Sequence, residues 1–244
     1  VEAERTATAD AALAWWTAQH RDPAPPLALP LDTERPARRA AAAVHATRTL
    51  APHVTGGILA TAARGGSTPV PVLLAGWSAF LHRLTGADDL VVGMTAASQA
   101  AAGAKGVVGH GVHVLPLRLR PAASLAAEAW IAAVRDATYD ALEHAGVTFG
   151  TVVRAVKPPR HPGRTPLVEV LFNYERTGEP PRLAGVAATV VATPKAGVAF
   201  DVVLHAVHAG DALRLEASAR ADIIGAATLA RWLADFEAVL AAFV

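Results

Sequence analysis

The sequence contains no cysteine among its 244 residues. This absence excludes disulfide bonds and thiolate metal sites, and it is typical of a protein from a reducing cytoplasm. An excess of one charge is also lacking, because 22 Lys and Arg residues nearly balance 21 Asp and Glu residues. Nothing in the composition therefore points to nucleic acid or to an acidic membrane, and we expect a cytoplasmic protein with neither partner.

Long hydrophobic runs are missing as well. The longest, around "VLLAGWSAFL", is far shorter than the ~20 residues that a membrane span needs. The charged opening "VEAERTATAD" lacks the apolar segment of a signal peptide. With 52% hydrophobic and 18% charged residues, the composition is that of a globular protein.

Hydrophobic periodicity predicts both helices and strands. Asp10 is expected to cap a helix over residues 11–20, and the prolines in residues 21–42 predict an extended connection. Later helices are expected from Thr68 to Gly86, from Ser124 to about residue 144, over residues 148–156 and from Gly225 onward. Pro116 predicts an edge or bulged strand. Several strands follow one another near the end, "VAATVVAT" among them, so we predict one α/β domain over residues 1–244, with a mixed sheet flanked by helices.

Ten histidines invite a metal interpretation. His110 and His113 are three residues apart, as are His205 and His208, and residues at that spacing in a strand point to opposite faces. No carboxylate cluster completes a ligand shell, so no metal is expected.

The other polar residues are interpreted as structural. Asp88 and Asp89 are read as a solvated turn. Arg160 and Arg164 offer an anion site, but an exposed connection is the stronger interpretation. His144, in the last turn of a helix, suits the negative end of the helix dipole better than an acid–base or metal role. The residues alone leave a globular α/β domain of unstated function.

Six segments, taken in order, resemble the motifs of nonribosomal peptide synthetase condensation domains. "LAWWTAQH...PLALPLDTERPA" is similar to "YWxxxL...LPxDxxRP". "STPVPVLLAGWSAFLHRLTGADDLVVGMTAA" is similar to "aTxxxxLLAAxxxLLxRxxGxxDxxVGxPxAxR". "GHGVHVLPLRLR" resembles "GxFVNTxxLR", and "HAGVTFGTVV" resembles "HQDxPFExLV". "RHPGRTPLVEVLFNY" and "AFDVVLHAV" resemble "RxxSRxPLFQVxFxx" and "FDLxL".

The resemblance implies one lobe of a larger fold. Condensation domains pair two lobes similar to chloramphenicol acetyltransferase, and the HHxxxDG motif of the N-terminal lobe assists attack of an amine on a thioester. The present sequence contains neither a His-His pair nor HxxxDG. The matched motifs are those of the C-terminal lobe. No cofactor is expected, because phosphopantetheine would arrive only on a partner carrier protein.

The resemblance also assigns positions. Arg118 is the candidate for the arginine that pairs with the aspartate of HHxxxDG, and we expect it to lack a partner in this chain. Several motif letters differ, with His113 at the family's asparagine and Gly163 at its serine. The positions matched, with structural or inter-lobe roles and no catalytic residue among them, are His113, Arg118, His144, Phe149, Arg160, Arg164, Pro166 and Asp201.

Two functions follow from the resemblance. The first is a truncated, non-catalytic module of a nonribosomal peptide or hybrid polyketide assembly line, a platform for a carrier protein, a neighbouring synthetase domain or a tailoring enzyme. The alternative is one half of an amide-forming acyltransferase, completed by an HHxxxDG lobe. A weaker third is a stand-alone acyltransferase that uses His144 or His113 with a coenzyme A thioester. The sequence leaves open whether the chain is an enzyme.

Overall fold

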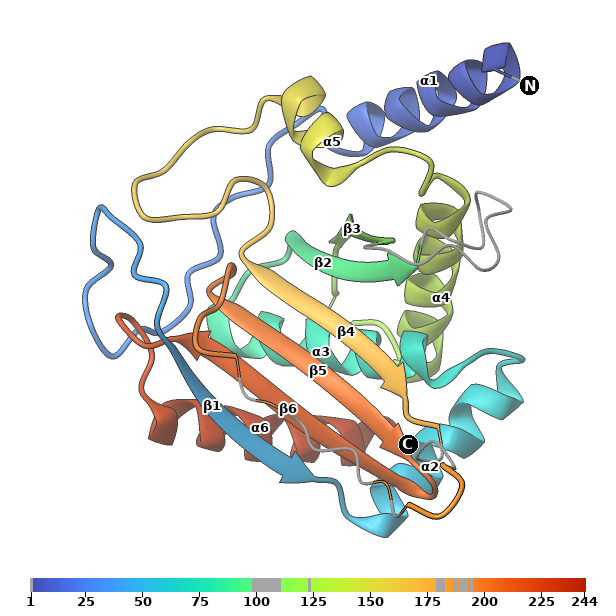
Figure 1. Cartoon of the computed structure of the whole chain (residues 1–244), viewed down its shortest axis with the longest axis vertical. Helices are drawn as coiled ribbons and strands as arrows, with labels where there is room; N and C mark the ends of the chain where they lie inside the picture. The colour runs from blue at the N-terminus through green and yellow to red at the C-terminus, as the bar shows by residue number, and fades with distance from the viewer. Residues whose placement is uncertain are drawn as a thin grey trace.

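The computed structural model describes residues 2–97, 111–122, 124–178, 183–186, 188, 193 and 195–244, with the backbone alone for residues 2–7. These residues form one mixed sheet in the strand order β1-β6-β5-β4-β2-β3 (Figure 1). The β2–β4 and β4–β5 pairs are parallel, and the other neighbours are antiparallel. The strands are β1 (Ala43–Thr49), β2 (Leu90–Ala97), β3 (Val112–Leu119), β4 (Val170–Arg176), β5 (Val202–Ala209) and β6 (Ala212–Arg220).

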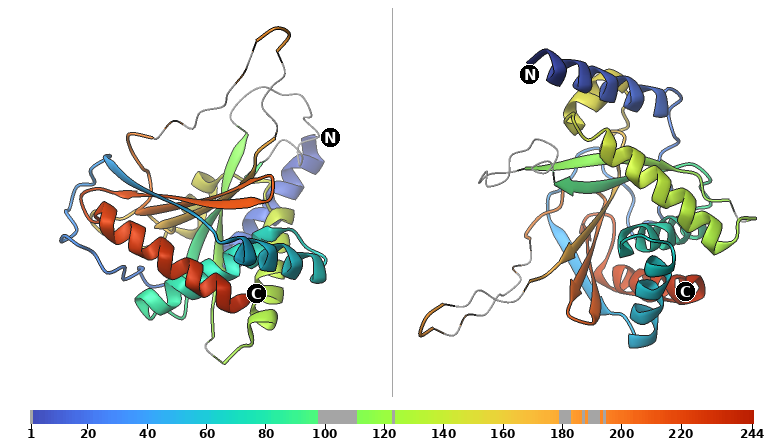
Figure 2. Two further views of the ribbon diagram at one scale, coloured as in Figure 1. Left: turned by 90° about the horizontal axis from the view of Figure 1, so that it is seen from below. Right: turned by 90° about the vertical axis from the view of Figure 1, so that its right-hand side faces the viewer.

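Helices cover one face of this sheet. Figure 2 shows α6 and α3 running beneath the strands, and α4 packs against β3. The opposite face is turned toward the viewer in Figure 1. The helices are α1 (Glu2–Gln19), α2 (Pro52–Arg64), α3 (Pro69–Thr85), α4 (Ala127–Glu143), α5 (Phe149–Val156) and α6 (Ala226–Phe243). The predicted mixed α/β architecture is confirmed. No helix in the described ranges is long and apolar enough to cross a membrane.

Local chemistry explains the best-predicted helix. Thr68 is the N-cap residue of α3 with extended backbone angles, and Pro69 follows in the first turn, where no N–H is needed. Gly86 ends the helix with φ of +71°, a left-handed angle that glycine adopts without strain. The buried side of α3 brings Trp77 and Phe80 against Phe236 of α6. This aromatic contact closes the core between the two helices and the sheet.

Two predicted helix starts are wrong. Asp10 lies inside α1, because the good helix formers before it extend the helix back to Glu2. Ser124 precedes α4 without capping it, since the Leu125 N–H bonds to the Ala122 carbonyl at 3.0 Å and the helix begins only at Ala127. The predicted strand "VAATVVAT" falls mostly outside the described residues.

The connection after α1 is extended. Residues 22–41 contain no helix or strand and run along the sheet edge beside the loop that follows α5 (Figure 1). Pro116 lies in β3, which is an edge strand as predicted, and its carbonyl faces α1. Buried side chains four residues apart attach α1 to the rest of the fold. They are Ala12 and Trp16 of α1 and His20, which directly follows the helix.

Candidate functional site

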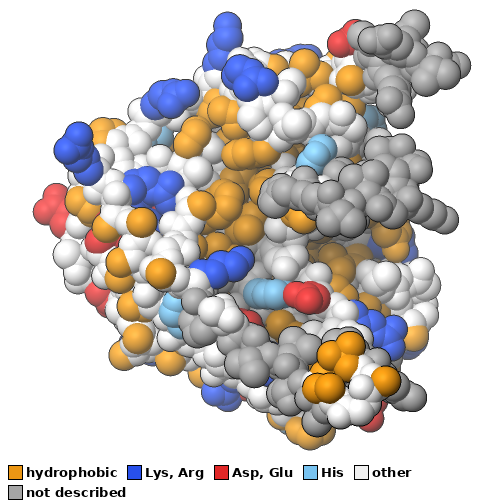
Figure 3. Space-filling model, viewed as in Figure 1, with side chains coloured by type: hydrophobic (Ala, Val, Ile, Leu, Met, Phe, Trp, Pro, Cys, Tyr) orange, Lys and Arg blue, Asp and Glu red, His pale blue; other side chains and the backbone are white. Residues whose placement is uncertain are grey.

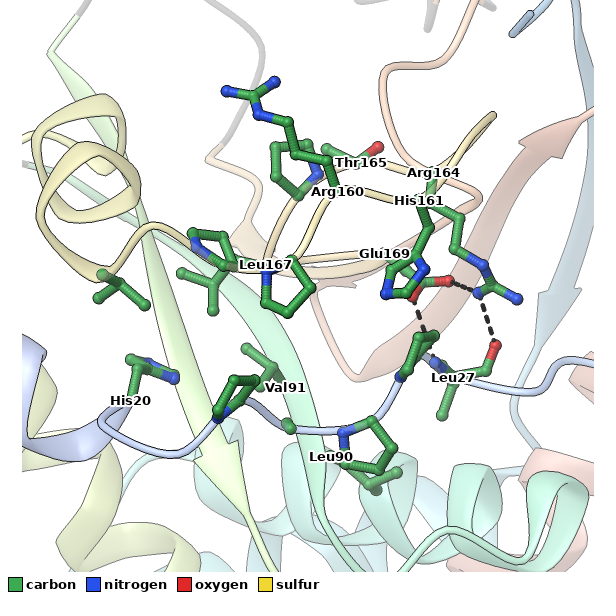
Figure 4. A pocket seen from close by; sticks show the side chains of 18 of the residues that line it. His20, Leu27, Leu90, Val91, Arg160, His161, Arg164, Thr165, Leu167 and Glu169 are labelled. Carbon is green, nitrogen blue, oxygen red and sulfur yellow. Dashed lines mark hydrogen bonds and ion pairs between the residues drawn. The ribbon is translucent and has the colours of Figure 1, made fainter. Parts of the chain in front are cut away.

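A pocket of about 370 Å³ opens between the end of α1, the connection, the start of β2 and the loop after α5 (Figure 4). That volume lies within the range of small-molecule sites. The walls are mainly apolar, with seven prolines together with Leu27, Leu90, Val91, Val156 and Leu167. Figure 4 places His20 at one end of the pocket and Glu169 at the other, and the loop after α5 adds Arg160, His161, Arg164 and Thr165.

His20 is a buried, neutral base. Its side chain is 3% exposed, and its Nε2 lies 2.9 Å from the Pro116 carbonyl oxygen. Because a carbonyl only accepts, Nε2 carries the proton and Nδ1 keeps a lone pair. Burial lowers the pKa of His20, which favours this neutral form. Within the part of the chain that is described, Nδ1 has no hydrogen-bond partner.

Glu169 ties the opposite end of the pocket to the connection. Its Oε1 accepts the Leu27 N–H at 3.2 Å, and its Oε2 accepts from the Arg164 guanidinium. Arg164 also donates to the Leu27 carbonyl at 3.0 Å. Burial raises the pKa of Glu169, although the charge of Arg164 opposes the shift. Arg164 is therefore engaged in holding the backbone, whereas Arg160 on the same loop is exposed.

The expectation that Arg118 lacks a partner is wrong. Its Nε donates to Asp89 Oδ1 at 2.8 Å and its Nη2 to Asp89 Oδ2 at 2.6 Å, a bidentate pair. Its Nη1 also donates to the carbonyls of Gln19 and Asp22, at 3.0 and 2.6 Å. Asp89 is thus not a solvated turn residue. The antiparallel register, which sets Val91 opposite Arg118, brings the two side chains together across a long connection, and sequence spacing does not reveal it.

The Asp89–Arg118 pair predicts a pH-dependent stability. Hydrogen bonds from Arg118 lower the pKa of Asp89. The stabilisation is therefore present above the unfolded pKa of about 3.9 and is lost as pH falls through the lower, folded value. We expect Asp89→Asn to lower the free energy of unfolding at pH 7 by about 1–3 kcal/mol, and by less as the pH drops below about 4.

Urea denaturation of both proteins across this pH range measures the difference. The matched control is Asp88→Asn, because Asp88 has an 81% exposed side chain. It should change stability by less than about 0.5 kcal/mol. A loss for Asp89→Asn that is unchanged at acid pH would show that the ion pair is not its cause.

The remaining motif positions near α4 and α5 are structural. His144 caps the C-terminal end of α4, with Nδ1 2.7 Å from the Asp140 carbonyl oxygen, and its ring stacks on Trp15 at 4.3 Å. His113 directs Nδ1 at the Ala145 carbonyl oxygen, 3.2 Å away. Phe149 is the first residue of α5. Both histidines thus use one ring nitrogen on a backbone carbonyl, which helps to hold the local fold.

A buried charge network holds the connection against the sheet. Asp201 and Arg220 have fully buried side chains, and their Oδ1 and Nη1 atoms lie 3.2 Å apart. Arg35 of the connection donates to Asp201 Oδ2 at 2.6 Å. Both arginines also donate to the Gly163 carbonyl, Arg220 at 2.6 Å and Arg35 at 3.2 Å. The pKa of Arg220 is raised, because the carboxylates of Asp222 and Asp201 outweigh the lowering effect of burial.

The structure thus gathers only some of the predicted positions. Arg160, Arg164 and Pro166 line the pocket, and Asp201 is linked to them through Arg35 and Gly163. Sequence reasoning missed several important residues. Arg35 stands in the matched "RP" letters, and His20 stands where the motif has leucine, so both could have been identified, whereas no local signal marks Glu169 or Arg220.

The face of the sheet opposite the helices carries a polar row. Pairing aligns Asn173, His205, Glu216 and Thr47 on adjacent strands. Thr95 donates to Asn173, and His205 Nε2 lies 3.1 Å from an oxygen of Glu175. The Glu175 side chain is 56% exposed, so this is not a buried histidine–carboxylate couple. Figure 3 shows a histidine beside acidic atoms on this face, below a hollow lined by hydrophobic side chains.

The histidine pairs do not gather around one point. His208 hydrogen-bonds through Nδ1 to the Tyr174 hydroxyl at 2.9 Å, away from the His205–Glu175 pair. Over the residues that can be placed, no group of three or more His, Asp or Glu side chains could hold a metal ion. His110, of the other proposed pair, lies outside the described residues.

Comparison with known proteins gives one consistent family. Residues 2–244 match the family described as "Condensation domain". Malpibaldin synthetase of Mortierella alpina is 30% identical over 234 residues, which cover 96% of the chain and 4% of the relative. Bacitracin synthase 1 of Bacillus licheniformis is 28% identical over 203 residues, which cover 83% of the chain and 4% of the relative. The chain thus spans a small part of the length of these relatives.

Solved structures agree on the fold. The four-domain nonribosomal peptide synthetase AB3403 superposes with a TM-score of 0.85 at 20% identity, covering 95% of this chain and 19% of that one. The condensation domain of the Monacolin K polyketide synthase MokA gives 0.84 at 21%, covering 99% and 58%. The X-domain in complex with OxyB from teicoplanin biosynthesis gives 0.83 at 18%, covering 96% and 52%.

Proposed function

Because the chain belongs to the condensation-domain family, we propose that it acts as a non-catalytic wall and docking platform in a nonribosomal peptide or hybrid polyketide assembly line. One observation carries the proposal: the polar side chains at most of the matched motif positions are engaged in holding the fold. Arg118 is bound by Asp89, Arg164 by Glu169, and Asp201 lies beneath two arginines.

Amide formation needs more than these residues offer. An amine and a thioester must be held in line beside a group that can take a proton. Among the described residues, neither His113 nor His144 pairs with a carboxylate, and His205 faces an exposed glutamate on an open sheet surface. Of the three functions, a stand-alone acyltransferase that uses either His113 or His144 is therefore the least supported.

The loop after α5 offers a surface for a partner. Lys157 and Arg160 are exposed beside the pocket, and neither forms an ion pair with a described residue. Figure 3 shows Lys and Arg side chains gathered along one side of this view. Charge of this kind steers and orients an acidic partner. We propose a carrier protein as that partner, with a neighbouring synthetase domain or a tailoring enzyme as alternatives. The structural relative from teicoplanin biosynthesis is itself seen in complex with OxyB.

Charge reversal on this loop should weaken docking. We expect Arg160→Glu to raise the dissociation constant for a carrier domain of the same assembly line by about tenfold at low salt. Isothermal titration calorimetry measures the effect. The matched control is Arg83→Glu, at an exposed arginine of α3 away from the loop, which should leave affinity unchanged. Equal losses in both variants, or no binding to any protein of the assembly line, would contradict the proposal.

The polar row on the open face favours a second candidate. Asn173, His205 and Glu216 suit a wall that lines a water-containing chamber better than a dry interface. The chain would then be one half of an amide-forming condensation enzyme, with phosphopantetheine delivered by carrier proteins and HHxxxDG on a second lobe. Condensation activity that appears only when such a lobe is joined or added would favour it. An in-frame HHxxxDG motif upstream of Val1 would do the same.

A further inference from the structure

The pocket between α1 and the loop after α5 has features that neither proposed function uses. His20 stands where the resembling motif has leucine, so a polar side chain replaces an apolar one at this wall. The side chain is 97% buried, as the complement of its 3% exposure. A buried nitrogen without a partner costs free energy, because it loses water and gains nothing in return. Nδ1 of His20 is such an atom.

Nδ1 of His20 keeps its lone pair because the other ring nitrogen, Nε2, carries the proton. Nε2 donates to the Pro116 carbonyl at 2.9 Å, which leaves Nδ1 as an acceptor. Burial lowers the pKa of the ring, so protonation does not remove that lone pair near neutral pH. Figure 4 shows the His20 ring at one end of the pocket, directed toward its interior. The pocket therefore presents an uncharged acceptor at its His20 end.

The walls favour a flat apolar ring. Pro23, Pro25 and Pro26 stand on one side, and Pro158, Pro159 and Pro162 on the other. Proline rings pack closely on aromatic faces, as they do when proline-rich peptides bind aromatic grooves. Val91 and Leu167 complete an apolar interior. A volume of about 370 Å³ accommodates one aromatic group with a short substituent.

The charged groups at the pocket favour a ligand with an uncharged hydrogen-bond donor. The two carboxylates at the pocket are already bound, Asp89 by Arg118 and Glu169 by Arg164, so no free anion balances a cationic ligand. The neutral His20 has no proton left to give an anion. Arg160 lines the pocket, but Figure 4 shows its guanidinium directed away from the interior. At the His20 end, a neutral O–H or N–H group is the chemistry that remains.

We propose that this pocket binds an aromatic ring bearing one uncharged hydrogen-bond donor, a phenol or an indole, with the donor on His20 Nδ1. Because Nδ1 is covered in this structure, the ring must turn slightly about its side-chain bonds as the ligand enters, a common change on binding. The group is either a free small molecule or a Tyr or Trp side chain of a partner protein. Because the Arg160 guanidinium is directed away from the pocket interior (Figure 4), docking through Lys157 and Arg160 does not require the site.

Two probes of the same shape test the inference on the wild-type chain. We expect 4-methylphenol to bind about tenfold more tightly than 4-methylanisole, which lacks the donor. NMR titration measures both affinities, and the imidazole ¹⁵N signal of His20 Nδ1 should shift with 4-methylphenol alone. Equal affinities, no binding of either probe, or an unmoved Nδ1 signal would overturn the proposal.

A variant and a peptide probe complete the test. His20→Leu should bind both probes equally, whereas the control His53→Leu, at an exposed histidine of α2, should keep the preference. Retention of the preference by His20→Leu would contradict the assignment. N-acetyltyrosinamide distinguishes the sources. Tighter binding than 4-methylphenol indicates a partner's side chain, and weaker binding indicates a free small molecule. None of these results depends on carrier binding, so the pocket and the docking proposal can fail separately.

Discussion

Replacement of Asp201 by alanine is expected to lower the free energy of unfolding by about 3–5 kcal/mol. The carboxylate has no exposed surface and lies between two guanidinium groups, those of Arg35 and Arg220. Arg220 is itself fully buried, so loss of Asp201 leaves it with a single carboxylate, that of Asp222, and the Gly163 carbonyl. Arg35 loses its 2.6 Å partner. A buried charge that loses one of its partners is costly because water cannot reach it. Urea denaturation monitored by tryptophan fluorescence measures the change.

A matched variant separates this effect from the loss of any carboxylate. Asp235 is exposed on α6, and Asp235→Ala should change stability by less than about 0.5 kcal/mol. A loss below about 1 kcal/mol for Asp201→Ala would mean that the network does not hold the connection against the sheet.

Restoring the serine of the resembling motif at Gly163 is expected to destabilise the fold by about 2–5 kcal/mol. Gly163 has φ of +69°, a left-handed angle that is strained for serine. A Cβ atom there would lie 2.1 Å from the Pro36 carbonyl oxygen, a contact that the backbone must move to relieve. Because Gly163 also accepts from Arg35 and Arg220, the movement would disturb the charge network.

The backbone strain can be measured by itself. Gly66 has φ of +59° and open space where a Cβ would stand, so Gly66→Ser carries the strain without the clash. Gly66→Ser should lower the free energy of unfolding by about 1–2 kcal/mol, which is less than the loss expected for Gly163→Ser. Equal losses at the two positions would show that the close approach of Pro36 has no consequence, and that this loop can adjust to a side chain.

Local patterns predicted those elements whose ends are set by local chemistry. Thr68, Pro69 and Gly86 define α3 without help from the rest of the chain, and Pro116 identifies an edge strand because it has no N–H to donate. Asp10 shows the limit of such reasoning. It is a good cap by residue type, but the helix continues through it because the preceding residues also favour helix.

The contacts around the pocket depend on pairs that are distant in sequence. Arg118 meets Asp89 because of a strand register, and Arg35 meets Asp201 across 166 positions of the chain. Neither partner carries a local mark of the contact. The family resemblance indicated that Arg118 needs an acidic partner, but it placed that partner in another lobe. Composition and periodicity describe which residues are buried and leave open which buried charges are neighbours.

Intact-mass analysis of carrier proteins provides the most direct test of the proposed role. Donor- and acceptor-loaded carrier proteins of the assembly line would be incubated with the 244-residue chain, and native mass spectrometry would record complexes and products together. We predict a complex with a carrier protein and no condensed product above the level without the chain. Condensed product formed by this chain alone would contradict the account, because it would show that these residues supply the acid–base chemistry that we assign elsewhere.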